Sequence, residues 1–248
     1  MKKGTDLSEF QRGINYTALF EAGIEFTMVR AGYGWTYTDP AFEQHINAFL
    51  SNGKACGVYW FIYATNPEEA VRNADKCLEV ISKFKGKLAL PIACDYEYDS
   101  DRYSTQQGAQ QSNASRTAII KAFCERIEQS GYFTSVYLNP DYISKVNYDE
   151  LKRFDLWLAE WGVDKPSREC GMWQYTDKLD VAGMRIDADI AYKDYEGIIK
   201  SRGLNGFQKP EPVKAEQKAA PKSEPEKKTI KITVEIDGSK YSGTIEKQ

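Results

Sequence analysis

Histidine is almost absent from this sequence, because His45 is the only one among 248 residues. It lies in a polar stretch with helical spacing, and we interpret it as a surface residue. A lone surface histidine excludes Ser-His-Asp and Cys-His catalysis and histidine-rich metal sites. Carboxylates must therefore carry any catalysis in this chain, and we expect no metal and no cofactor.

Cysteines are few and odd in number, with no C-x-x-C pair among Cys56, Cys77, Cys94, Cys124 and Cys170. We predict that they are reduced and mostly buried. The sequence also lacks an apolar run of about 18 residues that could cross a membrane. Nothing near its start combines a basic segment, an apolar run and a cleavage site, so we expect cytoplasmic synthesis without a signal peptide.

Neither sign of charge dominates, since the formal net charge is -3. Such a balance gives no general attraction to nucleic acid or to an anionic membrane, and we expect neither as a partner. Hydrophobic residues make up 42% of the chain and aromatic residues 13%. This composition is sufficient for a packed core in one barrel-sized domain or two smaller ones.

Apolar strands alternate with amphipathic helices through the first part of the chain. The predicted strands cover residues 3–7, 26–30, 55–63, 88–98 and 133–138, and the predicted helices cover 16–22, 40–50, 67–81 and 114–129. We expect a polar loop over 100–112. Three further strands, 154–161, 171–176 and 184–192, are separated by gaps too short for full helices. This order predicts an α/β fold, a TIM-like barrel of five βα units plus three further strands.

One predicted strand ends in alternating acids. In an extended strand residues two apart share a face, so Asp95, Glu97 and Asp99 would project to the same side. Either this face is an ordinary wet surface, or the crowding separates carboxyl pKa values for acid chemistry.

The predicted barrel brings further acids to the same place. Closure places strand ends from the whole chain at one mouth and makes the first and last strands neighbours. Asp6 and Asp187 are predicted at or near strand ends on that rim, together with Asp95 and Glu97. We therefore favour an active site over a wet surface, and we assign Asp99 to the solvated loop that follows.

The C-terminal part differs in composition from the barrel, which we expect to cover residues 1–203. Residues 204–228 are rich in proline, lysine and glutamate and predict an extended linker. Residues 229–248 predict a β-hairpin with a two-residue turn at Asp237-Gly238. The turn pairs residues 236 with 239, 235 with 240, 234 with 241 and 230 with 245, which leaves one face apolar. We expect this tail to bury that face against another copy of the chain, a cell wall or the barrel, for oligomerisation or wall binding.

The sequence resembles the family 25 glycoside hydrolases, the lysozyme-like muramidases of phage lysins and bacterial autolysins. The resemblance covers about residues 3–200. It rests on motifs in the family's order: Asp6-Leu7-Ser8 with Gln11, Arg30-Ala31-Gly32-Tyr33-Gly34 with Asp39-Pro40 and Phe42, Gly57-Val58-Tyr59-Trp60-Phe61, Asp95-Tyr96-Glu97, Leu156-Trp157-Leu158-Ala159, and Trp173-Gln174-Tyr175 with Ile186-Asp187.

This resemblance implies a barrel and hydrolysis of the β-1,4 bond between N-acetylmuramic acid and N-acetylglucosamine. It implies that Glu97 is the general acid, that Asp95 is its charged partner carboxylate, and that Asp6 and Asp187 are the other pocket acids. The sequence departs from the family pattern at two positions. Trp60 stands where many members have His, which we expect to alter sugar contacts. Asp189 stands where many have Asn, so the fourth pocket acid is either Asp187 or Asp189.

The implied partner is bacterial peptidoglycan, and the implied role is a phage endolysin that acts on the cell wall after release. For Tyr33, Tyr63, Tyr137 and Trp161 we predict sugar stacking or hydroxyl contacts, with packing in the barrel as the alternative. The hydrolytic route stays open between a protein nucleophile, an attacking water and the substrate's acetamido group. Two other classes of function are a catalytically silent sugar-binding module and a structural protein that assembles through its tail.

Overall fold

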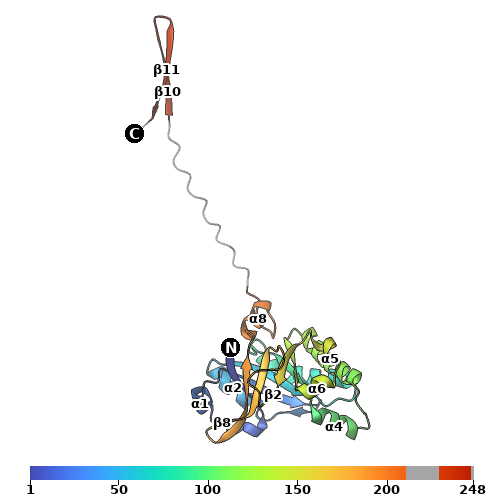
Figure 1. The fold of residues 1–248 in the computed structure, drawn as a ribbon. Coiled ribbons are helices and arrows are strands. Elements are labelled where there is room, and N and C mark those ends of the chain that lie inside the picture. The colour runs from blue at the N-terminus through green and yellow to red at the C-terminus, as the bar shows by residue number, and fades with distance from the viewer. Residues whose placement is uncertain (211–228, 247–248) are drawn as a thin grey trace. The chain divides into compact units, whose positions relative to one another are not determined.

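The computed structural model describes residues 1–210 and 229–246 of the chain. It divides into two compact units, Met1–Pro210 and Glu211–Gln248, which we describe separately (Figure 1). The predicted linker lies outside the described residues from position 211 to position 228. None of the helices in the described parts is long and apolar enough to cross a membrane.

Eight strands of the first unit close into the predicted barrel. They are β1 (Lys2–Leu7), β2 (Phe26–Tyr33), β4 (Ala55–Phe61), β5 (Ile92–Asp95), β6 (Thr134–Leu138), β7 (Asp155–Ala159), β8 (Met172–Val181) and β9 (Met184–Ala191). β1 pairs with both β2 and β9, which closes the barrel, and β9 runs antiparallel to both of its neighbours. A short extra strand, β3 (Tyr37–Thr38), pairs with β2.

The four predicted helices form on the outside of the barrel. They are α1 (Tyr16–Glu21), α2 (Phe42–Ser51), α3 (Pro67–Ile81) and α5 (Asn113–Gln129). α3 begins where the side chain of Asn66 accepts a hydrogen bond from the backbone N–H of Glu69, with Pro67 in the first turn. Asn and Pro at these positions are strong helix-start signals, which is why the sequence predicted this boundary well.

The predicted polar loop over 100–112 was wrong in its first half, which is helix α4 (Tyr98–Gln106). Glu97 caps this helix, and Ser100 completes a reciprocal capping box with it. Asp99 therefore lies in the first turn of a helix, where it pairs with Arg102, and not in a solvated loop. Periodicity could not reveal α4 because the helix buries only Ser100 and Ser104.

Five other short elements were also missing from the prediction. They are the 3-10 helices η1 (Glu9–Gln11) and η2 (Ser82–Phe84), and the helices α6 (Pro140–Ser144), α7 (Tyr148–Leu151) and α8 (Tyr195–Arg202). Each spans about two turns or fewer, which is too short for a repeating apolar pattern to show.

His45 is buried, so its interpretation as a surface residue was wrong. Its Nε2 donates to the carbonyl oxygen of Ser8 over 2.9 Å, and the hydroxyl of Tyr16 donates to its Nδ1 over 2.8 Å. Burial lowers the pKa of this imidazole, so the ring is neutral and both nitrogens are satisfied. The prediction for cysteine is confirmed, because all five thiols are free and buried.

The first unit extends past the boundary predicted at residue 203. Asn205 is fully buried, and its Nδ2 donates to the carbonyl oxygens of Leu88 over 2.8 Å and Leu90 over 3.0 Å. Its Oδ1 accepts from the backbone N–H of Phe133 over 2.7 Å. Asn205 thus ties the end of the unit to the segments that enter β5 and β6.

The second unit contains the predicted hairpin of β10 (Thr229–Ile236) and β11 (Ser239–Glu246). All four predicted pairs are confirmed in its register. Asp237 and Gly238 have φ of 50° and 77°, as a type I′ turn requires. The large side chains of one face are exposed within this unit, namely Ile230, Ile232, Val234, Ile236 and Tyr241.

Candidate active site

The four predicted acids converge on one cavity of about 270 Å³ at the mouth of the barrel. Asp6, Asp95, Glu97 and Asp187 line it, together with Ser8, Phe10, Gln11, Arg30, Tyr59, Phe61, Tyr137, Trp157, Trp161 and Gln174. Residues from the first and last strands of the barrel thus meet at one place, as we predicted from the closure of the barrel.

Asp6 and Asp187 lie directly opposite each other on neighbouring strands. Asp6 is near the carboxyl end of β1, as predicted, but Asp187 is in the middle of β9. The prediction that Asp187 lies near a strand end was therefore wrong. β9 runs antiparallel, and its pairing with β8 continues to a tight turn at Ala182 and Gly183. The middle of β9 is consequently level with the end of β1.

Asp95 and Glu97 reach the cavity from a strand end and a helix cap. Asp95 is the last residue of β5 and is 4% exposed, whereas Glu97 is half-buried at the start of α4. The strand stops at Asp95, so the prediction that Asp95, Glu97 and Asp99 alternate along one extended face was wrong. Asp99 does not line the cavity.

The carboxyls of Asp95 and Glu97 influence each other, and the pKa of each is raised. Oδ1 of Asp95 is buried without any donor, and its neighbour is the side chain of Glu97. Burial, and then the charge of Glu97, raises the pKa of Asp95 well above its usual range. Burial also raises the pKa of Glu97, while the hydrogen bond with Asp95 opposes that shift. Burial therefore favours the protonated forms of these two carboxyls at the cavity.

Arg30 is the cation of the cavity wall, but acids outside the cavity bind it. Its Nε donates to Oδ2 of Asp39 and its Nη2 to Oε1 of Glu9, both over 2.8 Å. Its charge lowers the pKa of Asp95, yet burial still dominates that carboxyl. Arg30 therefore does not return the pKa of Asp95 to its usual range.

Gln174 connects three groups of the cavity wall, and sequence reasoning gave it no role. Its Nε2 donates to Oδ2 of Asp6 over 2.8 Å, while its Oε1 accepts from the hydroxyl of Tyr137 over 3.0 Å and from Nε1 of Trp161 over 3.1 Å. The amide orientation is therefore fixed by three partners. The only sequence signal that pointed to Gln174 was its place in the Trp173-Gln174-Tyr175 motif.

The four predicted aromatic residues fall into two groups. Tyr137 and Trp161 line the cavity, and the Trp161 side chain is 49% exposed. Tyr33 and Tyr63 do not line it. They belong to a row of rings with Tyr37 and Tyr103, with centroid distances of 4.1 Å from Tyr37 to Tyr33, 5.2 Å from Tyr33 to Tyr63 and 5.0 Å from Tyr63 to Tyr103.

The two departures from the family pattern lie outside the cavity wall. Trp60 is fully buried, and its Nε1 donates to the carbonyl oxygen of Gly34 over 3.0 Å. The expectation that Trp60 alters sugar contacts was therefore wrong. Asp189 is also fully buried and does not line the cavity, whereas Asp187 does. Of the two, Asp187 is the acid that faces the cavity.

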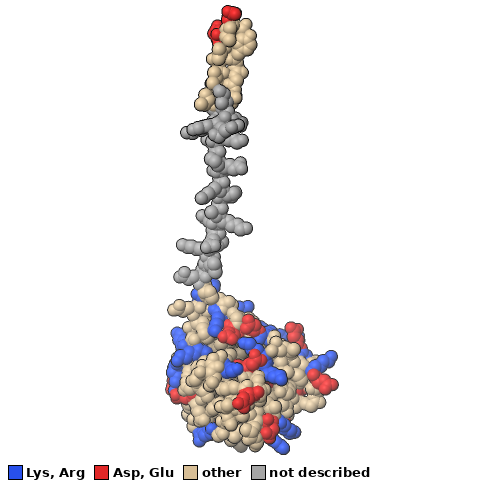
Figure 2. Space-filling view, turned by 90° about the vertical axis from the view of Figure 1, so that its left-hand side faces the viewer, with Lys and Arg blue, Asp and Glu red and all other residues tan. Residues whose placement is uncertain are grey.

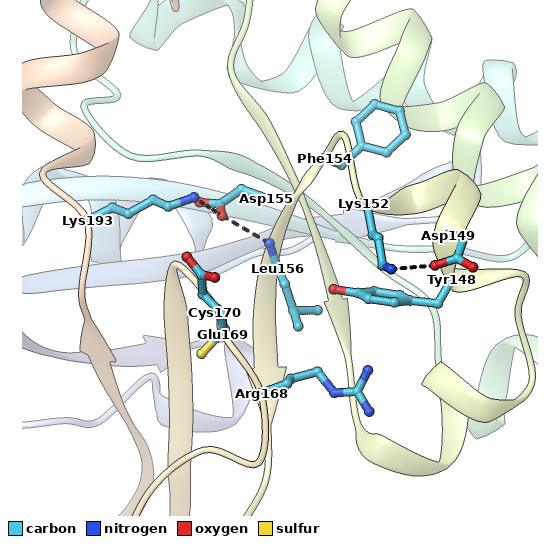
Figure 3. A pocket seen from close by; sticks show the side chains of 10 residues that line it. All are labelled: Tyr148, Asp149, Lys152, Phe154, Asp155, Leu156, Arg168, Glu169, Cys170 and Lys193. Atoms are coloured by element: carbon cyan, nitrogen blue, oxygen red, sulfur yellow. Dashed lines mark hydrogen bonds and ion pairs between the residues drawn. The ribbon is translucent and has the colours of Figure 1, made fainter.

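A larger cavity of about 680 Å³ lies at the start of β7, away from these acids (Figure 3). Lysines pair with two of its three carboxylates, Lys193 with Asp155 over 2.6 Å and Lys152 with Asp149 over 2.5 Å. Crowded acids are absent there, so it offers no acid chemistry. Across residues 1–210 and 229–246, no cluster of three or more histidine, cysteine or acidic side chains is placed to hold a metal ion.

Comparisons with known proteins give one family. The sequence model of "Glycosyl hydrolases family 25" matches residues 5–184. The autolytic lysozyme of Clostridium acetobutylicum is 25% identical over 190 residues, which are 76% of this chain and 54% of that protein. The N,O-diacetylmuramidase of Chalaropsis sp is 27% identical over 181 residues, which are 70% of this chain and 84% of that protein. The chain thus spans about half the length of the first of these relatives.

Two solved structures show the same fold. The CTP1L endolysin has a TM-score of 0.69 at 24% identity, over 81% of this chain and 70% of that one. A family 25 glycosyl hydrolase from Bacillus anthracis has a TM-score of 0.67 at 21% identity, over 80% of this chain and 92% of that one.

Proposed function

The chain belongs to glycosyl hydrolase family 25, as its motifs predicted, and from this membership we propose that it is a muramidase. The bond it cleaves is the β-1,4 bond between N-acetylmuramic acid and N-acetylglucosamine in bacterial peptidoglycan. The names of its relatives, autolytic lysozyme and N,O-diacetylmuramidase, support this substrate. The observation that carries the proposal is the convergence of four carboxyls, those of Asp6, Asp95, Glu97 and Asp187, on one cavity.

Glu97 is the proton donor in this proposal. A glycosidase needs one carboxyl that protonates the leaving oxygen and another that is charged. Asp95 is nearly fully buried, so Glu97 is the member of the pair whose proton can reach a sugar in the cavity. When Glu97 gives up the proton, the hydrogen bond with Asp95 stabilises its new charge.

Asp187 stabilises the positive charge that develops on the sugar ring, with Asp6 beside it on the neighbouring strand. Burial raises the pKa of Asp187 to about 6, so Asp187 is largely ionised at neutral pH. Burial and the charges of Asp189 and Asp187 raise the pKa of Asp6 well above its usual range, and the hydrogen bond that Asp6 accepts from Gln174 opposes this shift. Both carboxyls line the same cavity as Glu97.

Aromatic rings supply the sugar contacts. Trp161 offers an exposed face at the cavity, and Tyr137 offers a ring at its wall. The ring centroid of Tyr33 lies 6.0 Å from the guanidinium carbon of Arg30, and Arg30 lines the cavity. The row of aromatic rings that includes Tyr33 and Tyr63 therefore passes beside the cavity. We assign Tyr33 and Tyr63 to sugars further along the glycan.

A role as a phage endolysin that acts on the wall after release is consistent with this activity. Figure 2 shows both signs of charge interspersed over one face of the first unit, which offers no large one-sign patch there for a polyanion. The competing reading, a silent sugar-binding module, does not explain the acids. Burying carboxyls is costly, and sugar binding alone does not need them.

For the hairpin we propose association with a second copy of this chain. Its exposed face is made of aliphatic side chains and Tyr241, and its other face carries the opposed Glu235 and Lys240. An aliphatic face offers no hydrogen bonds to wall sugars, but it complements an identical face. A single two-stranded hairpin is also marginally stable, whereas two stacked hairpins bury their apolar faces.

The test of the proposed activity is a product analysis on purified peptidoglycan. We expect turbidity to fall and the new reducing ends to be muramic acid. New reducing ends of glucosamine would contradict the assigned bond, and binding without any new reducing end would favour the silent module.

A further inference from the structure

The position of Glu97 depends on a short turn between β5 and α4. Asp95 is the last residue of β5, and Glu97 directly precedes the first residue of α4. The one residue between these two acids is Tyr96, whose side chain is fully buried. The groups that hold Tyr96 therefore help to fix the turn from which Glu97 reaches the cavity.

Asp101, in the first half of α4, bonds to this turn on both sides of the Glu97 side chain. The hydroxyl of Tyr96 donates to Oδ1 of Asp101 over 2.8 Å. The backbone N–H of Asp101 donates to the carbonyl oxygen of Glu97 over 3.3 Å. Asp101 thus contacts the residue before Glu97 through its side chain and Glu97 itself through its backbone.

Two neighbouring helices fix the Asp101 carboxylate. From α5, Nε of Arg116 donates to both carboxylate oxygens over 2.9 Å, and its Nη2 lies 2.8 Å from Oδ2. From α6, the hydroxyl of Tyr142 donates to Oδ2 over 3.0 Å. The side chains of Arg116 and Asp101 are only 14% and 22% exposed, so solvent screens this pair weakly. Charge-assisted bonds of this kind hold the carboxylate in one orientation.

The cluster lies outside the cavity, because Asp101, Arg116 and Tyr142 do not line it. These three side chains can affect chemistry in the cavity only through the groups that they position. Of the two hydroxyls that bond to Asp101, only that of Tyr96 belongs to the turn beside Glu97, whereas that of Tyr142 belongs to α6.

We propose that Asp101 is a positioning residue that holds Glu97 at the cavity through its hydrogen bond with Tyr96. The inference rests on the proposed function, in which Glu97 is the proton donor. A general acid must lie within hydrogen-bonding reach of the atom that it protonates. A displacement of about 1 Å can lower the rate by about 100-fold, so a fixed turn matters for this step.

The test compares Tyr96→Phe with Tyr142→Phe in the full-length protein. Each variant keeps its buried ring and removes one O–H donor to Asp101, and Arg116 still donates to the oxygen that loses this donor. Both variants should therefore lower the Tm by a similar amount, about 2–4 °C. Only Tyr96→Phe should also lower kcat on solubilised peptidoglycan, by about 10-fold, with KM nearly unchanged. An unchanged kcat in Tyr96→Phe, or equal losses of kcat in the two variants, overturns the proposal.

Amide hydrogen exchange supplies a second measurement that does not need catalysis. The N–H of Asp101 reports on the turn, because it donates to the carbonyl oxygen of Glu97. We expect it to exchange about 10-fold faster in Tyr96→Phe than in Tyr142→Phe, since only the first variant frees the turn. Equal exchange rates in the two variants overturn the proposal. If the unchanged protein does not cleave peptidoglycan, the proposed function fails, while the exchange rates still decide whether Tyr96 and Asp101 hold this turn.

Discussion

At the residue scale, the hydrogen bonds of Gln174 connect the side chains that form one wall of the cavity. Its side-chain amide forms hydrogen bonds with Asp6, Tyr137 and Trp161, which come from two strands and the segment after β7. Its three hydrogen bonds fix the orientation of the Asp6 carboxyl and the position of the Trp161 indole. An amide is suited to this task because it donates on one side and accepts on the other.

Replacing this amide with a carboxyl, Gln174→Glu, should destabilise the protein in a pH-dependent way. An ionised carboxyl repels Asp6 and has no N–H to donate, whereas a protonated one can still donate. We expect a loss of about 2 kcal/mol in the free energy of unfolding near pH 8 and a smaller loss near pH 5. Denaturant unfolding at both pH values measures this difference, and an equal loss at both would contradict the role of the Asp6 contact.

At the element scale, the sequence predicted the strands and the long helices because their apolar patterns repeat. It missed α4, which begins at the polar Glu97 cap and buries only two serines. It also misjudged His45, because a buried histidine satisfied by Ser8 and Tyr16 looks like any polar residue in sequence. Asp6 and Asp95 were predictable from strand ends, whereas Glu97 caps α4 and Asp187 lies in the middle of β9. Gln174 was not, because its role exists only once β1, β6 and β8 are assembled.

Asn205 shows how one side chain after the last helix fixes several elements. It satisfies two carbonyl groups and one N–H from the segments that enter β5 and β6. We expect Asn205→Ala to lower the free energy of unfolding by about 3 kcal/mol, since three buried backbone groups lose their partners. Gln208→Ala, at an exposed position nearby in sequence, is the matched control and should change little. A loss equal to that of the control would show that the three groups find other partners.

At the scale of the whole molecule, the chain combines a barrel unit with a hairpin unit of different character. The barrel buries its apolar side chains in its own core, whereas the hairpin leaves its aliphatic face exposed within its own unit. We infer that the hairpin controls how many copies act together, and that the barrel carries the chemistry.

Val234→Lys should abolish self-association, because it places a charge in the centre of the aliphatic face. Thr233→Lys puts the same charge on the opposite face of the same strand and should leave association intact. Light scattering of the full-length variants measures the mass directly. A strictly monomeric unchanged protein would contradict the proposal for the tail.

The central claim is that Glu97 gives up its proton to the glycosidic oxygen, and the most direct test is the rate at which Glu97→Gln releases muramic acid reducing ends from purified peptidoglycan. Loss of general acid catalysis should lower this rate by about 100-fold or more, while the Tm stays the same or rises because a half-buried acid is replaced by an amide. Glu68→Gln, an exposed acid on α3, should keep the full rate. A folded Glu97→Gln protein that releases muramic acid ends at the unchanged rate would contradict the account.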